Sequence, residues 1–194
     1  MPLPPRNQAA LDFLLTRRSR PHKTLTTPVP DRAELKGLLT AAARSPDHGK
    51  LEPWRFIVLE RDALLRLADL VAERAKALGV DPDTVPKAVS QYADAHLAVA
   101  VIESPKDSAK VPAIEQTYSA GAVCLALLNA SLAAGWGANW LSGWASHDRT
   151  FAETGLGIAP HERIAGIIHL GTETNAPPER PRPDVAALTT WMSE

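Results

Sequence analysis

The stretch of the chain that decides the fold extends from Gln116 to Ser146 and reads QTYSAGAVCLALLNASLAAGWGANWLSGWAS. It contains no charged side chain, so a membrane span is one interpretation of it. Two features argue against that interpretation: Asn129 and Gly135 interrupt the apolar residues, and alanine outnumbers leucine and isoleucine. We therefore predict a helix from about Gln116 to Ala134 that is buried in protein on most sides.

The predicted helix is too long for one small domain to cover alone. It has about five turns, and a chain of 194 residues has little surface to spare for enclosing it. We expect a second copy of the chain to supply the remaining cover. The sequence therefore predicts a homodimer.

The composition is that of one globular domain. Of the 194 residues, 45% are apolar and 22% are charged, and the formal net charge is -1. A chain without excess charge and without a run of Lys and Arg has little attraction for nucleic acid or an anionic membrane, so neither partner is expected. We predict a single domain over residues 1-194, in which residues 1-7 and 184-194 form extended tails or arms that wrap a partner.

Cys124 is the single cysteine, so an internal disulfide and a cysteine-based zinc site are both excluded. This favours a reducing, cytoplasmic setting. Residues 1-6 lack the apolar core of a secretory signal, so no export is expected.

Local patterns along the chain predict alternating helices and strands. Asp31, with Glu34 three residues later, predicts a helix start, and Gly79 predicts a helix end. Residues 96-102 and 164-170 are apolar on both faces, so we expect them to be buried strands. The predicted helices span about 8-17, 31-44, 64-78, 83-92, 116-134 and 149-154, and the strands 56-59, 96-102, 138-141 and 164-170. This order predicts a layered α/β or α+β domain around one sheet.

Several well-known cofactor motifs are absent from the sequence. Gly135-Trp136-Gly137 begins like a dinucleotide fingerprint, but Trp140 occupies the third glycine position and the helix precedes the motif. The chain has no Walker loop, no Gly-x-Ser-x-Gly sequence and no pair of histidines four residues apart. We expect neither a Rossmann domain nor a metal site.

Two basic clusters could bind an anion. Arg17-Arg18-Ser19 combines guanidinium groups with a hydroxyl, which suits a phosphate or another oxyanion. The alternative is a solvated helix end, where positive charge is favourable in any case. Arg180 and Arg182 flank Pro181 in a stiff segment and form the second pair, for which the alternative is a flexible charged tail.

A third cluster combines polar and aromatic residues. Arg44 and His48 lie in a loop rich in Pro and Gly that leads into the first strand, and Ser142 lies in a similar loop. Four of the five tryptophans fall in these two loops, namely Trp54, Trp136, Trp140 and Trp144. Their placement outside the obvious core indicates a site for a flat, partly aromatic ligand.

Together these residues resemble the nitroreductases that depend on flavin mononucleotide (FMN), in particular their short single-domain bacterial branch. The resemblance covers Leu11 to Arg182. Its landmarks in this chain are Arg17-Arg18-Ser19, Arg44-Ser45-Pro46-Asp47-His48, Pro53-Trp54, Ala134-Gly135-Trp136-Gly137, Trp140-Leu141-Ser142-Gly143 and Leu170-Gly171-Thr172.

The resemblance implies a nitroreductase-like α+β fold with α/β/α layers. A central mixed sheet is flanked by helices, and the long buried helix lies at the dimer interface. It also implies a homodimer that binds FMN at that interface. NADH or NADPH would reduce the flavin in a ping-pong cycle, and a nitroaromatic, a quinone or a similar conjugated small molecule would accept the electrons. No protein residue needs a catalytic role, because the flavin carries the chemistry.

The resemblance also assigns site residues. Those that would contact FMN are Arg17, Arg18 and Ser19 at the phosphate and ribityl oxygens, Arg44 and His48, Trp140, Leu141 and Ser142 along the ring, and Arg182 or, as second choice, Arg180 at the phosphate. Arg17 is also expected to tune the flavin, and residues 130-135 correspond to a nicotinamide-nucleotide segment. Relatives can have Arg at the position of Leu141 and Gln at that of Glu52, so the acceptor is expected to differ.

Three alternatives remain at this point. The chain could be a specialised flavoenzyme of the same fold that fragments flavin or removes halogen by reduction. It could instead be a non-catalytic protein that binds flavin, or a structural domain without a cofactor.

Overall fold

The structure is a computed structural model that describes residues 5-193. Its helices are α1 (Gln8–Thr16), α2 (Arg32–Ala42), α3 (Arg61–Leu78), α4 (Val85–Ala93), α5 (Ala113–Ala133) and α6 (Trp144–His147), with short turns η1 (His22–Thr24), η2 (His48–Lys50) and the π-helical η3 (Phe151–Gly155). Its strands are β1 (Leu25–Thr26), β2 (Trp54–Glu60), β3 (Leu97–Glu103), β4 (Gly137–Leu141) and β5 (Arg163–Glu173). Met1–Pro4 and Glu194, which belong to the expected tails, lie outside the described residues.

The five strands form one sheet in the order β1-β5-β3-β2, with β4 also paired to β5. We expected a mixed sheet, and every strand pair among the described residues is antiparallel. The connection between β2 and β3 gives the reason. The helices α3 and α4 connect the end of β2 to the start of β3 and return the chain to the same end of the sheet. Leu97, the first residue of β3, therefore pairs with Glu60, the last residue of β2.

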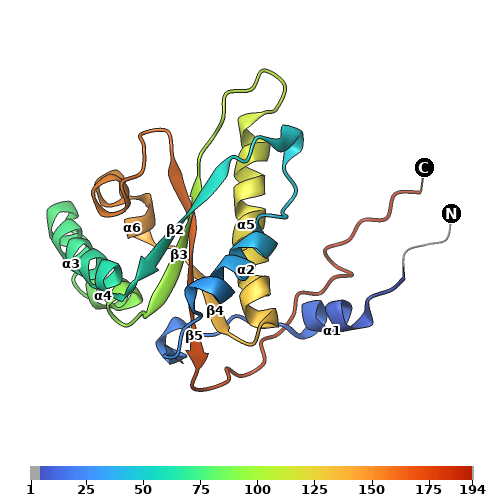
Figure 1. Cartoon of the computed structure of the whole chain (residues 1–194), viewed down its shortest axis with the longest axis horizontal. Helices are drawn as coiled ribbons and strands as arrows, with labels where there is room; N and C mark the ends of the chain where they lie inside the picture. Colours follow the sequence, from blue (N-terminus) through green and yellow to red (C-terminus); the bar gives the residue numbers. More distant parts are fainter. Residues whose placement is uncertain (1–4, 194) are drawn as a thin grey trace.

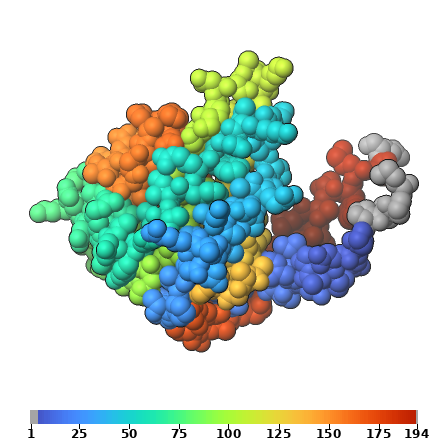
Figure 2. All heavy atoms as spheres, in the orientation of Figure 1, coloured from blue at the N-terminus to red at the C-terminus, as the bar shows by residue number. Residues whose placement is uncertain are grey.

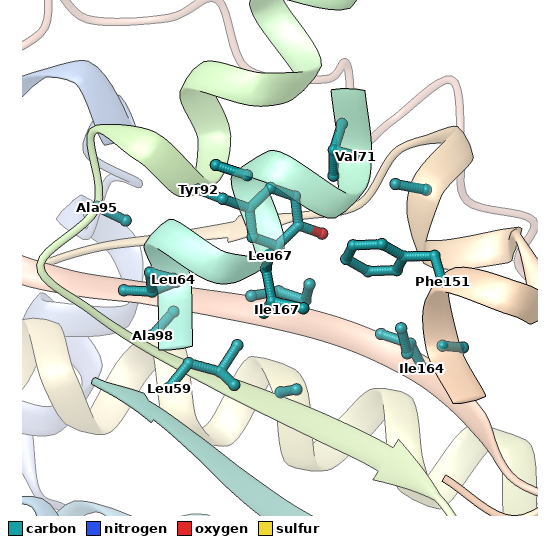
Figure 3. Packing of buried hydrophobic residues seen from close by; sticks show 14 of the residues in the cluster. Leu59, Leu64, Leu67, Val71, Tyr92, Ala95, Ala98, Phe151, Ile164 and Ile167 are labelled. Carbon is teal, nitrogen blue, oxygen red and sulfur yellow. The ribbon is translucent and has the colours of Figure 1, made fainter. Parts of the chain in front are cut away.

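Helices cover both faces of the sheet (Figure 1). Alternate residues of β3 enter two separate cores, because successive side chains of a strand point to opposite faces. Ala98, Ala100 and Ile102 pack with α3, α4 and α6, a core that also holds Phe151 (Figure 3). Leu97, Val99 and Val101 pack with α2 and α5 on the other face. This architecture confirms the α+β layered fold, and the full burial of β3 confirms it as a central strand.

The helix start expected at Asp31 and the helix end expected at Gly79 are both present in the structure. The Asp31 carboxylate accepts hydrogen bonds from the backbone N–H groups of Ala33 and Glu34, and the Glu34 carboxylate accepts one from the backbone N–H of Asp31. Gly79 ends α3 with a φ of 63°, a left-handed conformation that glycine adopts without strain. These two helix ends are therefore confirmed.

Other elements differ from expectation. α5 begins at Ala113, three residues before the expected start, and so includes Glu115. β1 and α6 were not expected, and the predicted helix 149-154 is a π-helical turn shifted to Phe151–Gly155. Trp54 lies in β2 instead of in the preceding loop. β1, α6 and the π-helical turn have five residues or fewer, so local sequence patterns carry little signal for them.

The leucine stripe of α1 does not enter the core of its own chain. No residue of α1 is buried, and Leu14 and Leu15 are exposed. Figure 2 shows α1 and the C-terminal residues projecting from one side of the body. Within residues 5-193, no helix has the combination of length and apolar content needed to cross a bilayer.

Candidate functional site

A basic cavity of about 280 Å³ lies where α1, the end of α5 and the start of β4 meet. Arg17 follows α1 directly, and its backbone N–H donates to the carbonyl oxygen of Phe13 (2.7 Å). The backbone N–H of Arg20 donates to the carbonyl oxygen of Ala138 at 2.8 Å, which ties the basic segment to β4. The lining residues are Phe13, Thr16, Arg17, Arg18, Arg20, Leu132, Gly135, Trp136, Gly137 and Glu173.

The guanidinium groups in this cavity have unused donors. The side chain of Arg17 donates to Ser19 Oγ at 3.1 Å, but the Nε atoms of Arg17 and Arg18 are buried without a partner. A buried cationic donor without an acceptor is costly, so the arrangement favours an anion beside it. Glu173 is the one carboxylate among the lining residues, and its Oε2 forms an ion pair with Arg20 Nε at 3.3 Å.

Arg182 acts on the same cavity from the C-terminal segment. The pKa of Arg17 is lowered, first by burial and then by the positive charges of Arg182 and Arg18. Arg182, which forms an ion pair with Glu179 at 2.9 Å, therefore lies near Arg17 although the two are far apart in sequence. Arg180 and Arg182 are both exposed and neither lines the cavity, so the preference for Arg182 rests on the effect of its charge on Arg17.

A partly exposed aromatic surface follows along β4. Trp140 is 37% exposed, and its indole lies where a β-carbon at Gly166 of β5 would be. Only glycine at position 166 leaves room for this indole. Leu141 is half-buried and Ser142 is exposed, so all three residues expected at a ring site border solvent at the end of β4.

A second cavity, of about 570 Å³, borders the same flank of α5 as the basic cavity, and charged residues such as Asp148, Arg149 and Arg163 also line it. It is lined by Thr117, Gly121 and Ala165, the last adjacent to Gly166, while Leu132 lines the basic cavity. Residues four and eleven positions apart return to one side of a helix, and Gly121 and Leu132 are about 16 Å apart along its axis. The two cavities therefore lie along one side of α5.

The structure does not bring Arg44 and His48 to these cavities within one chain. His48 Nδ1 lies 2.6 Å from Glu115 Oε2, in the first turn of α5, and Arg44 is exposed after α2. Glu115 and Leu132 are about 25 Å apart along the helix. The expected site residues therefore form two groups at opposite ends of α5.

Sequence reasoning missed four residues of this arrangement. Arg20 and Glu173 line the basic cavity, Gly166 makes room for Trp140, and Glu115 contacts His48. A glycine inside an apolar strand was a visible signal for Gly166. Glu115 was hidden because its partner is far away in sequence.

Comparison with known proteins decides the family. Residues 14-172 match the family model described as "Nitroreductase family". The chain belongs to the nitroreductase family. This confirms the resemblance and identifies the protein as an oxidoreductase.

Two curated relatives of this nitroreductase family member are 33% identical to it. "Putative NAD(P)H nitroreductase YdjA" of Escherichia coli K12 aligns over 163 residues, which are 84% of this chain and 87% of the relative. "Putative NAD(P)H nitroreductase" of Haemophilus influenzae aligns over 165 residues, 84% of this chain and 88% of the relative.

Solved structures share the nitroreductase fold with this chain. A nitroreductase-like family protein from Bacillus cereus is 22% identical with a TM-score of 0.79, and the match covers 100% of both chains. A nitroreductase from Bacteroides fragilis, described with bound FMN, is 18% identical with a TM-score of 0.73, covering 97% of this chain and 100% of its own. These likenesses confirm the fold class.

Proposed function

We propose that this protein is an FMN-dependent oxidoreductase that transfers hydride from NADH or NADPH, through the flavin, to nitroaromatic, quinone or similar conjugated acceptors in a ping-pong cycle. The observation that carries the proposal is the cavity in which Arg17 and Arg18 have buried, unpartnered donors near Arg182. A doubly negative phosphate ester is a suitable acceptor for those donors.

The residues present fit FMN at both of its ends. Arg17, Arg18, Ser19 and Arg182 would hold the phosphate and the neighbouring ribityl oxygens, and Trp140, Leu141 and Ser142 would line the ring. When bound, FMN supplies the two-electron chemistry that no side chain of the site provides. The protein's contribution is to hold the ring against β4 with one face open to a nicotinamide or an acceptor.

Exposed apolar surface supports a homodimer. Ile114, Tyr118 and Leu125 form a stripe on the outer side of α5 and are 52%, 67% and 44% exposed. This stripe leaves one side of α5 uncovered in a single chain, and a second copy of the chain would cover it. The exposed leucines of α1 and the apolar C-terminal residues around Trp191 would then serve as arms that wrap the partner.

The dimer would also complete the site. If two α5 helices pack antiparallel about a twofold axis, the beginning of one lies beside the end of the other. His48 of the partner subunit would then approach the basic cavity of this chain, and so would the partner's Arg44. The FMN site is therefore proposed at the interface, with residues from both copies.

Residues near the ring would set the choice of acceptor. Leu141 contributes no charge at a position where relatives can have Arg, and Glu52 adds an anion where they can have Gln. We expect a preference for uncharged acceptors over anionic ones. The segment 130-135, of which residues 133-135 are exposed, would contact the nicotinamide nucleotide. A cytoplasmic location stays a prediction.

The visible spectrum of the purified protein tests the proposal. We expect flavin absorbance that is retained on gel filtration and bleached by NADH or NADPH, and steady consumption of NADPH once a quinone is added. Parallel double-reciprocal plots would support the ping-pong order. Bleaching without turnover would support a flavin-binding protein without this activity, and a colourless protein that takes up no FMN would refute the proposal.

A further inference from the structure

The loop between α2 and β2 has a strained backbone. Lys50 and Glu52 are the only non-glycine residues with positive φ within residues 5-193, at 54° and 49°. Gly49, which lies between His48 and Lys50, also has a positive φ, of 76°. Such conformations cost free energy and persist only where the surrounding structure imposes them, which is common at functional sites.

Side chains hold this loop in place from both ends. Ser119 of α5 donates its hydroxyl to the carbonyl oxygen of Pro46 at 2.8 Å and accepts a hydrogen bond from Trp54 Nε1 at 3.1 Å. The backbone N–H of Glu52 donates to Asp47 Oδ2 at 2.7 Å. The first half of α5 therefore acts as a rigid base for the loop.

His48 lies at the centre of the loop and points outward. Its side chain is 61% exposed, and within residues 5-193 its one hydrogen-bond partner is Glu115, whose Oε2 lies 2.6 Å from His48 Nδ1. A carboxylate accepts hydrogen bonds but donates none, so it favours the imidazole form with the proton on Nδ1. Nε2 is then left as an acceptor without a hydrogen-bond partner within residues 5-193.

Stability does not explain this arrangement. An ion pair or hydrogen bond this exposed contributes little to the free energy of folding. A strained loop that fixes an exposed imidazole is therefore better explained by a ligand outside the chain's own core.

We propose that Glu115 is a positioning residue for His48, which it holds with Nδ1 protonated so that Nε2 accepts a hydrogen bond from a ribityl hydroxyl of FMN in the basic cavity of the partner subunit. This inference rests on the proposed function. Glu115 itself does not touch the cofactor and acts through the imidazole.

Titration of the apoprotein with FMN, followed by flavin fluorescence, tests the inference. We expect the Kd for FMN to rise about threefold to tenfold in Glu115→Ala, the effect of one lost or misaligned hydrogen bond. Glu115→Gln keeps a hydrogen-bond acceptor and should stay within about twofold of the original Kd. Adding Glu115→Ala to His48→Ala should change nothing further, because both changes remove the same interaction.

Nitrogen-15 NMR of the His48 ring in the apoprotein gives a readout independent of FMN. The original chain and Glu115→Gln should show a proton on Nδ1, whereas Glu115→Ala should show a mixture of the two neutral forms. Glu60→Ala, which removes an exposed pair with Arg32 at 3.0 Å, is the matched control and should alter neither the ring nor the Kd.

The outcomes separate this inference from the proposed function. Additive effects of Glu115→Ala and His48→Ala on the Kd, or an unchanged His48 ring in Glu115→Ala, would overturn the positioning role while FMN binding stands. An original chain that binds no FMN would overturn the proposed function and this inference together. The ring spectrum would then still report whether Glu115 orders the imidazole.

Discussion

Individual charges in the basic cavity oppose folding and favour ligand binding. The Arg17 guanidinium is partly buried, its pKa is lowered by that burial and by Arg182 and Arg18, and its Nε has no partner. These features reduce the stability of the protein without FMN. A bound anion would accept the unused hydrogen bond and balance the positive charge, and so offset that loss. The same residue should therefore affect stability and binding in opposite directions.

Arg17→Ala tests this opposition. We expect the Kd for FMN to rise tenfold or more, since about 1.5-3 kcal/mol is typical of a hydrogen bond to a charged group. The reduction potential of bound flavin should fall if Arg17 also tunes the flavin, because a positive charge in the site stabilises reduced, anionic flavin. The apoprotein should unfold at the same urea concentration or a higher one.

Fluorescence titration, potentiometry and urea unfolding measure the three effects. Arg32→Ala, at an exposed position outside the proposed site, serves as the control and should leave the Kd within about twofold. Unchanged FMN retention and potential in Arg17→Ala would show that the role belongs to other residues.

A buried histidine should make stability depend on pH. Burial, followed by the charge of His22, lowers the pKa of His169 to about 3, and the two rings lie 6.1 Å apart between centroids. The unfolded chain binds a proton at His169 below about pH 6.5, whereas the folded chain resists it until about pH 3. Stability is therefore lost progressively as the pH falls between these two values.

The expected size of the effect is about 2 kcal/mol between pH 7 and pH 5 from His169 alone. The pKa of His22 is also lowered, by burial first, with Lys23 and Lys87 acting in the same direction and Asp94 against it. Urea unfolding at the two pH values should show a smaller loss in His169→Leu than in the original chain. Equal losses would contradict the proposed linkage.

Among the helices, local sequence signals determine where each one begins and ends, and tertiary packing determines which part of the core or site it supports. The capping box at Asp31 begins α2, whose residues Leu35, Leu38 and Ala42 pack against α5 and the sheet. The strained loop with His48 follows this helix. A frayed α2 would therefore weaken one wall of the core and the base of that loop.

Asp31→Ala should reduce the free energy of unfolding by about 1 kcal/mol, as for other helix N-caps. Asp31→Asn keeps an oxygen that accepts from the backbone and should recover most of the loss. Arg32→Ala, one residue further on, removes only an exposed ion pair and should cost less than about 0.5 kcal/mol. Urea unfolding of the three variants measures the differences, and an Asp31→Ala loss no larger than that of Arg32→Ala would contradict the capping role.

For the whole molecule, exposed apolar surface and a divided site lead to the same proposal. The outer stripe of α5 is uncovered, and the two groups of expected site residues lie at opposite ends of that helix. A second copy would cover the stripe and join the groups. Assembly and cofactor binding should therefore be lost together.

If the proposed dimer forms, Tyr118→Glu should convert it into a monomer, because the change places a charge in the middle of the proposed interface. The side chain is 67% exposed in the single chain, so the fold should remain intact. Light scattering coupled to gel filtration measures the mass, and FMN retention should fall with it. Leu78→Glu, at a position 51% exposed at the end of α3, is the control and should remain dimeric. A dimeric Tyr118→Glu would place the interface elsewhere.

Local patterns in the sequence were sufficient for the main helices, the two buried strands and the residues that resemble a nitroreductase. Asp31, Gly79 and the apolar runs act through neighbours a few positions away, so their effect can be predicted without a fold. Three features could not be predicted from the sequence and are seen only in the tertiary structure. They are the antiparallel strand pairing, the approach of Arg182 to Arg17, and the separation of His48 from both arginines. They depend on how distant elements pack, and that free energy is shared among contacts that no short stretch of sequence contains.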